Sequence, residues 1–153
     1  MEKIQFRKAK SDDLPRIIAM LADDILGAKR EQNISPLPQS YVKAFQTIDS
    51  DPNQELMVVV LDGIVIGTFQ LTFIQYLNYC GSSRMMIESV RISSEFRGRG
   101  LGEKVMQWTM NHARQRGVRM LQLTSDKQRP EAIKFYERLG FVASHEGFKL
   151  HFQ

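Results

Sequence analysis

The segment that most constrains this chain is EFRGRGLGEK, residues 95–104, in which three glycines alternate with Arg97, Arg99 and Leu101. The residues before it, RMMIESVRIS, are rich in apolar side chains and predict a β-strand. The residues after it place apolar side chains from Leu101 to Trp108 on one face of a helix. We therefore predict a strand, a glycine turn and a helix in direct succession.

A glycine turn that opens a helix is suited to binding an anion. The first N–H groups of a helix have no partner within the helix, and its N-terminus has about half a unit of positive charge. Glycine has no Cβ, so the main chain can approach a phosphate closely. Arg97 and Arg99 add two full charges nearby. The spacing fits neither a Walker loop, because no Gly-Lys-Ser/Thr follows, nor the dinucleotide pattern GxGxxG.

The rest of the chain predicts further strands and helices. Asp62-Gly63 joins two β-rich runs and is a strong hairpin signal. Gly117 and Gly140 are expected to end helices, and Pro130 to begin one. The expected elements are a strand over 3–9, helices over 11–26 and 39–50, two strands within 55–77, a strand over 84–93, a helix ending at 117, a strand over 118–126, a helix over 129–140, and a short closing strand or hairpin within 141–152.

Composition limits the class of protein. A length of 153 residues suits one domain over 1–153, and Cys80 is the only cysteine, so no disulfide can form within the chain. No apolar run approaches the ~20 residues of a membrane span, and the N-terminal residues lack the apolar block of a signal peptide. We therefore expect a cytoplasmic protein that has no membrane partner. A net charge of +4 is low for a dedicated nucleic-acid binder, and we expect no nucleic-acid partner.

Two segments together resemble a known family. The glycine run fills the pattern R-x-x-G-x-G with Arg97, Gly100 and Gly102. A later pattern, A-x-x-F-Y-x-x-x-G-F, is filled by Ala132, Phe135, Tyr136, Gly140 and Phe141. With the order of elements, these motifs make nearly the whole chain resemble the GCN5-related N-acetyltransferases (GNAT). The residues around 123–141 also resemble small-molecule amine acetyltransferases, including the aminoalkylphosphonate type.

The resemblance implies an α/β (α+β) fold: a mixed, mostly antiparallel, twisted sheet with helices on both faces and a V-shaped split that holds acetyl-CoA. It implies that the glycine loop grips the pyrophosphate of the coenzyme, and that the strand before it pairs its main chain with the pantetheine arm. A main-chain N–H near Val90 would then stabilise the thioester oxyanion. The residues assigned to the coenzyme in this way are Val90, Arg91, Ile92, Arg97, Gly98, Arg99, Gly100, Leu101 and Gly102.

Two further coenzyme residues lie where this chain departs from the family pattern. The family often has an asparagine near here, whereas this chain has SDKQRP, residues 125–130. The sequence therefore leaves two questions open: whether Asp126 contacts the coenzyme, and whether Arg129 contacts its 3′-phosphate or faces water.

Two side chains are candidates for catalysis. Glu88 is the expected general base: it lies on the strand before the loop, and simple alternation places Met86 and Val90 on its face, which would partly desolvate its carboxylate. Its alternative role is that of a solvated or salt-bridged strand residue. Tyr136 is the expected general acid, because a phenol with a pKa near ~10 can protonate a leaving thiolate. Its alternative role is core packing beside Phe135.

The expected reaction moves an acetyl group from acetyl-CoA to a primary amine of a small molecule by direct attack. Asp23, Asp24 and Glu31 are acidic side chains that could attract the ammonium form of such an acceptor. The alternatives are a protein Nα or lysine acetyltransferase, a non-catalytic acyl-CoA sensor, and a basic nucleic-acid binder. The three histidines show no metal spacing, so no metal is expected, and His112 is expected to have a satisfied partner on the buried face of its helix. Family habit implies a homodimer.

Overall fold

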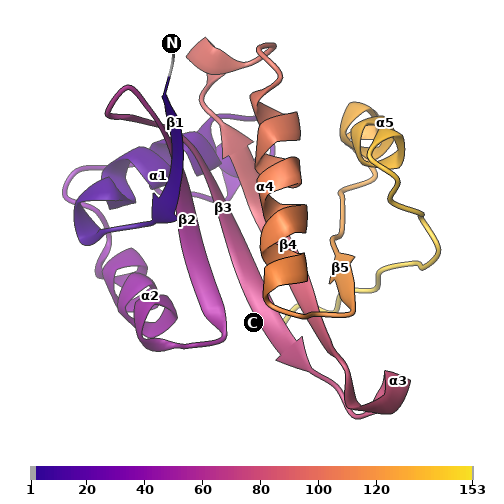
Figure 1. The fold of residues 1–153 in the computed structure, drawn as a ribbon. Coiled ribbons are helices and arrows are strands. Elements are labelled where there is room, and N and C mark those ends of the chain that lie inside the picture. The colour runs from indigo at the N-terminus through magenta and orange to yellow at the C-terminus, as the bar shows by residue number, and fades with distance from the viewer. Residues whose placement is uncertain (1–2, 153) are drawn as a thin grey trace. The chain divides into compact units, whose positions relative to one another are not determined.

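The computed structural model of the chain describes residues 3–152. Its tertiary contacts divide the chain into two compact units, of which the first ends at Gln122 and the second begins at Leu123. A single domain over 1–153 stays a prediction. In the order of Figure 1, the first unit contains β1 (Ile4–Lys8), η1 (Ser11–Asp13), α1 (Leu14–Ala22), η2 (Gly27–Lys29), α2 (Gln39–Ser50), β2 (Gln54–Leu61), β3 (Ile64–Gln75), α3 (Asn78–Gly81), β4 (Ser83–Ile92), η3 (Ser94–Phe96), α4 (Leu101–Gln115) and β5 (Met120–Gln122). The second unit contains α5 (Pro130–Arg138).

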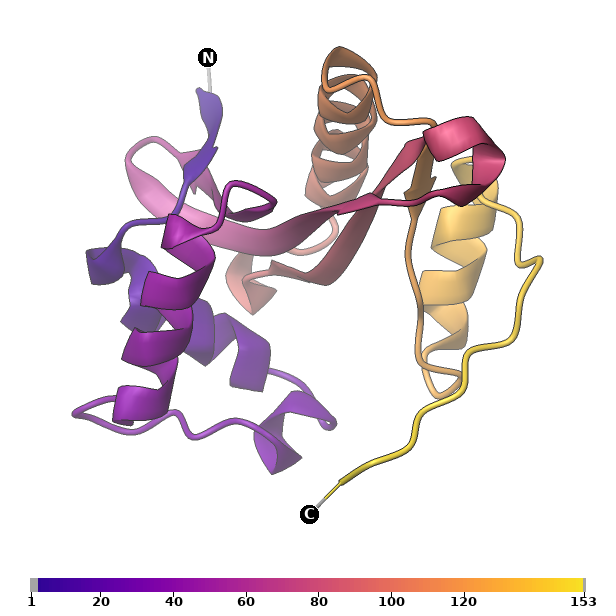
Figure 2. The same cartoon turned by 90° about the horizontal axis from the view of Figure 1, so that it is seen from below.

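The sheet confirms the predicted fold class. Its strand order is β1-β2-β3-β4-β5, with antiparallel pairing from β1 to β4 and a parallel pairing of β5 to β4. Figure 2 shows α1 and α2 on one face of this sheet and α4 on the other. Asp62 and Gly63 join β2 to β3 with φ values of 47° and 86°. Two successive positive φ angles match the right-handed twist of a two-residue hairpin, so the predicted Asp-Gly turn is confirmed.

The core has one layer on each face of the sheet. On the side of α1 and α2, buried Ile17 and Phe45 pack with Val58 and Val60 of β2. On the side of α4, the Trp108 ring stacks on Phe6 at 5.2 Å between centroids. Because neighbouring strand residues point to opposite faces, the apolar run of β2 is buried on both sides, which is why it lacks a polar alternation.

Three predicted elements differ from the structure. The first helix ends at Ala22, and Ile25, expected on its apolar face, is 80% exposed. The strand expected over 118–126 is limited to Met120–Gln122. Residues 141–152, expected to form a strand or hairpin, have no helix or strand, and the apolar side chains at 148, 150 and 152 are exposed. An alternating pattern alone does not make a strand, because a strand also needs a neighbour for its main-chain hydrogen bonds.

The start of α1 allows a test of stability. The Arg7 guanidinium donates to both Asp13 carboxylate oxygens, at 2.7 and 3.1 Å, and the Lys10 N–H donates to Asp13 at 2.7 Å. The hydrogen bond from Arg7, opposed by burial, lowers the pKa of Asp13 from its usual value. A lowered folded-state pKa stabilises the fold above the unfolded pKa of about 3.9, and this gain is lost as the pH falls through the folded value.

We therefore expect Asp13→Asn to lower the free energy of unfolding at pH 7 by about 1 kcal/mol, since Arg7 is partly exposed and solvent screens the pair. Urea denaturation at pH 7 and pH 3 measures the effect, and the difference from the wild type should shrink at pH 3. Asp12→Asn is the matched control, because Asp12 is exposed on the same short helix. An equal loss in both variants would contradict the prediction.

Candidate functional site

The glycine loop, residues 97–102, links β4 to α4. Gly98 and Gly100 have φ values of 76° and 70°, and Gly100 is the N-cap residue of α4. No heavy atom lies within 4 Å of where a Cβ would stand at either glycine, other than their immediate chain neighbours. The main chain of both glycines is therefore open on this side, at the start of a 15-residue helix whose first N–H groups have no partner within the helix.

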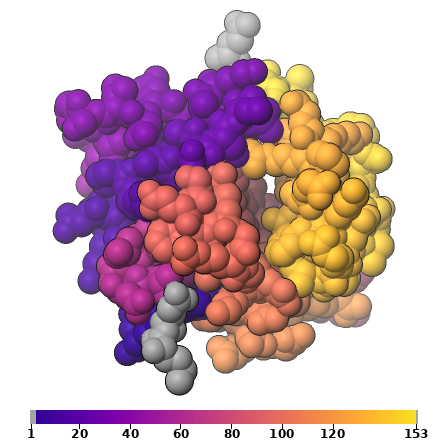
Figure 3. All heavy atoms as spheres, turned by 90° about the horizontal axis from the view of Figure 1, so that it is seen from above, coloured from indigo at the N-terminus to yellow at the C-terminus, as the bar shows by residue number. Residues whose placement is uncertain are grey.

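The two loop arginines have different surroundings. Arg97 donates from Nε to the Ile92 carbonyl at 3.0 Å and from Nη2 to the Asp23 carbonyl at 3.2 Å. The Arg99 guanidinium lies over the Phe96 ring, 5.2 Å from its centroid. Figure 3 shows the salmon atoms of the loop region beside the indigo-to-violet atoms of the segment that follows α1. Arg97 thus joins the start of the loop to the ends of β4 and α1.

Strand β4 changes its pairing twice before it reaches the loop. Its parallel pairing with β5 covers only Arg84 to Met86, whereas β4 continues to Ile92. On the β3 side, the register shifts between Glu88 and Arg91, and Ser89 has a φ of 54°. This is a β-bulge, in which one extra residue of β4 is left out of the ladder. The last six residues of β4 therefore have no β5 partner among the described residues.

The bulge corrects the expected surroundings of Glu88. Glu88 pairs with Gln70 and Arg91 pairs with Thr68. Because Gln70 and Thr68 share one face of β3, Glu88 shares its face with Arg91, three residues later, and the assumed alternation with Val90 was wrong. Glu88 is also exposed, so the expected desolvation of its carboxylate is not observed.

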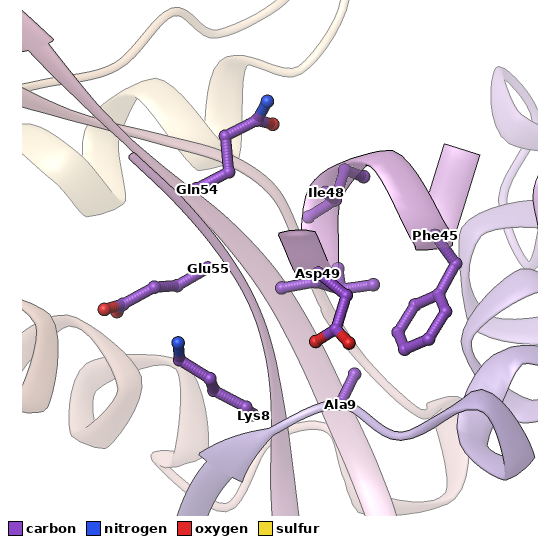
Figure 4. Close-up of a pocket in the computed structure, with 8 residues that line it drawn as sticks. Lys8, Ala9, Phe45, Ile48, Asp49, Gln54 and Glu55 are labelled. Carbon is purple, nitrogen blue, oxygen red and sulfur yellow. The ribbon is translucent and has the colours of Figure 1, made fainter. Parts of the chain in front are cut away.

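Two of the hollows that residues 3–152 form have very different sizes. The first, between α2 and the strands β1 and β2, has a volume of about 10 Å³, room for at most one water (Figure 4). The second has a volume of about 320 Å³ and lies between α1 and residues 93–95, directly before the glycine loop. Arg16 helps to line it and donates to the Val65 carbonyl and to Ser93 Oγ, each at 3.1 Å. A hollow of small-molecule size therefore borders the loop.

The second unit contains the other predicted residues. Tyr136 lies on α5, half-buried, with its ring in edge contact with Phe135 at 5.2 Å and Phe141 at 5.9 Å. The Asp126 carboxylate accepts the Gln128 N–H at 2.9 Å, and the Arg129 N–H donates to the Asp126 carbonyl at 2.9 Å. These bonds form the turn that leads into α5, for which Arg129 is the N-cap residue.

Comparison with known proteins gives three relevant likenesses. Residues 22–141 match the model of the acetyltransferase (GNAT) family. An aminoalkylphosphonate N-acetyltransferase of Salmonella typhimurium is 24% identical over 151 residues, covering 97% of this chain and 91% of that protein. A solved structure described as a transcriptional regulator from Bacillus halodurans C-125 is 49% identical, with a TM-score of 0.94 over 98% of this chain and all of that one.

The family match covers well over half of the chain, and this decides the assignment. The chain belongs to the GNAT family. This GNAT protein is an acetyl-CoA-dependent N-acetyltransferase. The fold also matches glucosamine-6-phosphate N-acetyltransferase from Arabidopsis thaliana, at 21% identity and a TM-score of 0.78 over 99% of both chains. The open space beside Gly98 and Gly100, at the start of α4, fits a site for the diphosphate of its cosubstrate, acetyl-CoA.

The structure of this GNAT enzyme also reveals ion pairs that sequence reasoning missed. Asp23 and Asp24, which could attract an acceptor ammonium, pair with arginines of the segment predicted to bind the coenzyme: Asp23 with Arg97 at 3.4 Å and Asp24 with Arg91 at 3.6 Å. Both acids follow α1, whereas Arg91 lies near the end of β4 and Arg97 follows that strand, so only the fold brings them together. No sequence spacing could have paired them.

Other side chains have structural roles. His112 contacts the buried carboxylate of Glu55 at 2.8 Å, which confirms its expected partner, and Arg116 donates to the same carboxylate at 2.7 Å. In Figure 4 the Glu55 side chain points away from α2. Within residues 3–152, no group of three or more His, Cys, Asp or Glu residues is arranged to hold a metal ion. None of the described helices has both the length and the apolar character needed to cross a membrane.

Proposed function

We propose that this GNAT enzyme acetylates the primary amine of a small molecule by direct attack on the thioester of acetyl-CoA. The observation that supports this most is the structure of β4 and the loop after it. The pairing of β4 with β5 ends at Met86, a bulge follows at Ser89, and the open glycine loop comes after the strand. The aminoalkylphosphonate N-acetyltransferase, which aligns with 97% of this chain at 24% identity, supports the proposal that the acceptor is a small molecule.

In this proposal the coenzyme is bound mainly by main-chain groups. The amides of Gly98 to Gly102 hold the diphosphate, with Arg97 and Arg99 supplying charge. The main chain of Val90 to Ile92 pairs with the pantetheine arm as an added strand would, because β5 does not pair with this part of β4. Arg129, presented by the turn that Asp126 forms, contacts the 3′-phosphate.

The chemistry needs a neutral amine, a stabilised oxyanion and a proton for the leaving thiolate. Glu88, acting through a water molecule, removes a proton from the acceptor ammonium. The amine nitrogen then attacks the thioester carbonyl carbon, and the Val90 N–H stabilises the oxyanion. When the C–S bond breaks, its electron pair leaves with sulfur, and the Tyr136 phenol protonates the thiolate. The nitrogen loses its second proton to solvent and the Tyr136 phenolate regains one from solvent, giving an amide, CoA and the restored phenol.

Two measurements test the proposal. Calorimetry with acetyl-CoA should give a saturable heat, and a panel of amines should release CoA thiol in its presence. The panel should include aminoalkylphosphonates, amino sugars, and peptides with free Nα or lysine amines. Thiol release with peptides alone would favour the protein acetyltransferase over the small-molecule enzyme. Coenzyme binding without thiol release from any amine would favour a non-catalytic sensor.

Glu88→Gln is expected to lower turnover by only about tenfold, less than the roughly 10²- to 10⁴-fold that a positioned general base contributes, because the carboxylate is exposed and acts through water. The Kd for acetyl-CoA should not change. The loss should be largest near neutral pH, where most of the acceptor is protonated and needs an ionised base, and should shrink at alkaline pH, where the amine is already neutral. Glu137→Gln, an exposed carboxylate change on α5, is the control. Equal turnover in Glu88→Gln and the wild type at every pH would remove Glu88 from the mechanism.

A second candidate function is binding to DNA, favoured by the 49% identical structure described as a transcriptional regulator. The net charge of +4 is small for this role. Fluorescence anisotropy with labelled duplex DNA distinguishes a DNA-binding regulator from the proposed acetyltransferase. A specific regulator should bind tightly with a steep salt dependence, whereas the proposed enzyme should not bind at physiological salt.

The expected homodimer and cytoplasmic location stay predictions of the same proposal. Light scattering after size exclusion reports the mass of the particle directly. A monomer of 17.7 kDa would contradict the dimer and leave the proposed chemistry untouched.

A further inference from the structure

Adjacent carboxylates after α1 face two arginines of the proposed coenzyme site, but the two ion pairs differ in exposure. The Asp24–Arg91 pair is largely covered, with side chains 23% and 15% exposed. The Asp23–Arg97 pair is open to solvent, with side chains 46% and 49% exposed. An exposed pair is weak and easily exchanged for another partner, whereas a covered pair is not.

Arg97 does not need the Asp23 carboxylate to keep its place. Its Nε donates to the Ile92 carbonyl at 3.0 Å, and its Nη2 donates to the Asp23 main-chain carbonyl at 3.2 Å. The carboxylate contact is longer, at 3.4 Å. Both carbonyl bonds survive a change of the Asp23 side chain, so the guanidinium would stay at the start of the glycine loop without it.

We propose that the Asp23 carboxylate is a placeholder for the coenzyme diphosphate: it pairs with Arg97 while the loop is empty and is displaced when the diphosphate binds. This inference rests on the proposed function. One guanidinium then serves two anions in turn, and the carboxylate opposes the diphosphate both by competing for Arg97 and by direct repulsion. Asp23 therefore weakens coenzyme binding and speeds the release of CoA after the reaction.

The test is the affinity of CoA for Asp23→Asn. Asparagine keeps the size of the side chain and an oxygen that accepts from Arg97, but removes the negative charge. We expect the Kd of CoA to fall by about fivefold at low salt, mainly through slower dissociation, and the gain to shrink in 1 M NaCl. Asp12→Asn, which removes the same charge from η1, should leave the Kd unchanged.

Ligand fragments locate the effect. Dephospho-CoA retains the diphosphate and should gain as much as CoA, whereas pantetheine lacks the diphosphate and should bind both proteins equally. Asp23→Ser removes the same charge with a shorter side chain and should also bind CoA more tightly, which provides a second variant should Asp23→Asn fold poorly.

The outcomes separate the two proposals. If the wild type binds CoA and both Asp23 variants bind it equally or more weakly, Asp23 is not a placeholder, while the proposed function stands. If the Asp23 variants gain as much affinity for pantetheine as for CoA, the effect does not arise at the diphosphate, and the placeholder proposal is again overturned. If the wild type itself binds no CoA, the proposed function fails and this inference fails with it.

Discussion

Gly100→Val should abolish measurable binding of acetyl-CoA, weakening it by more than about a hundredfold, or about 2.8 kcal/mol. Gly100 has a φ of 70° at the N-cap of α4, a conformation that costs a residue with a Cβ about 1–2 kcal/mol and a β-branched residue more. Valine therefore either strains the turn or re-forms it. In both cases its side chain fills the open space beside the first amides of the helix.

Gly117→Val is the matched control for Gly100→Val. Gly117 follows α4 at its other end, with a φ of 68° and the same open space around a Cβ. Both substitutions should lower the melting temperature by similar amounts, because the backbone strain is alike. Only Gly100→Val should lose the calorimetric signal with acetyl-CoA. Normal coenzyme affinity in folded Gly100→Val would refute the assignment of the loop.

Tyr136→Phe should lower kcat by about a hundredfold, the lower end of what a positioned general acid contributes. Phenylalanine keeps the ring and its edge contacts with Phe135 and Phe141, so the packing of α5 should survive. The Kd for acetyl-CoA should change little, since the hydroxyl acts on sulfur only when the C–S bond breaks. Steady-state kinetics with the best amine, and calorimetry with acetyl-CoA, measure the two quantities separately.

A pH profile and a packing variant show whether the hydroxyl itself is responsible. If the phenol is the acid, the wild-type kcat falls at alkaline pH as the phenol ionises, and Tyr136→Phe lacks this decline. Phe135→Leu disturbs the neighbouring ring and keeps the hydroxyl, so it should lower stability and leave kcat near the wild-type value. Unchanged turnover in Tyr136→Phe would remove Tyr136 from the reaction.

Sequence alone predicted the features that depend on neighbours along the chain. The Asp62-Gly63 hairpin, the glycine loop before α4 and the helix end at Gly117 all follow from backbone conformations that few residues adopt. The apolar periodicity of α4 likewise predicted its buried face, which includes Leu101 and Val105. The family resemblance rested on the same local signals, because its two motifs are short and contiguous.

What sequence could not predict depends on partners far along the chain. The bulge at Ser89, which places Glu88 on the same face as Arg91, arises from the register between β3 and β4. The alternation of residue types within β4 does not predict it. The ion pairs of Asp23 and Asp24 join residues about seventy positions apart. Local conformational preferences belong to each segment and can be read from it. Register, strand length and charge pairing are decided only when the folded chain brings distant segments together, because their energies exist only in that contact.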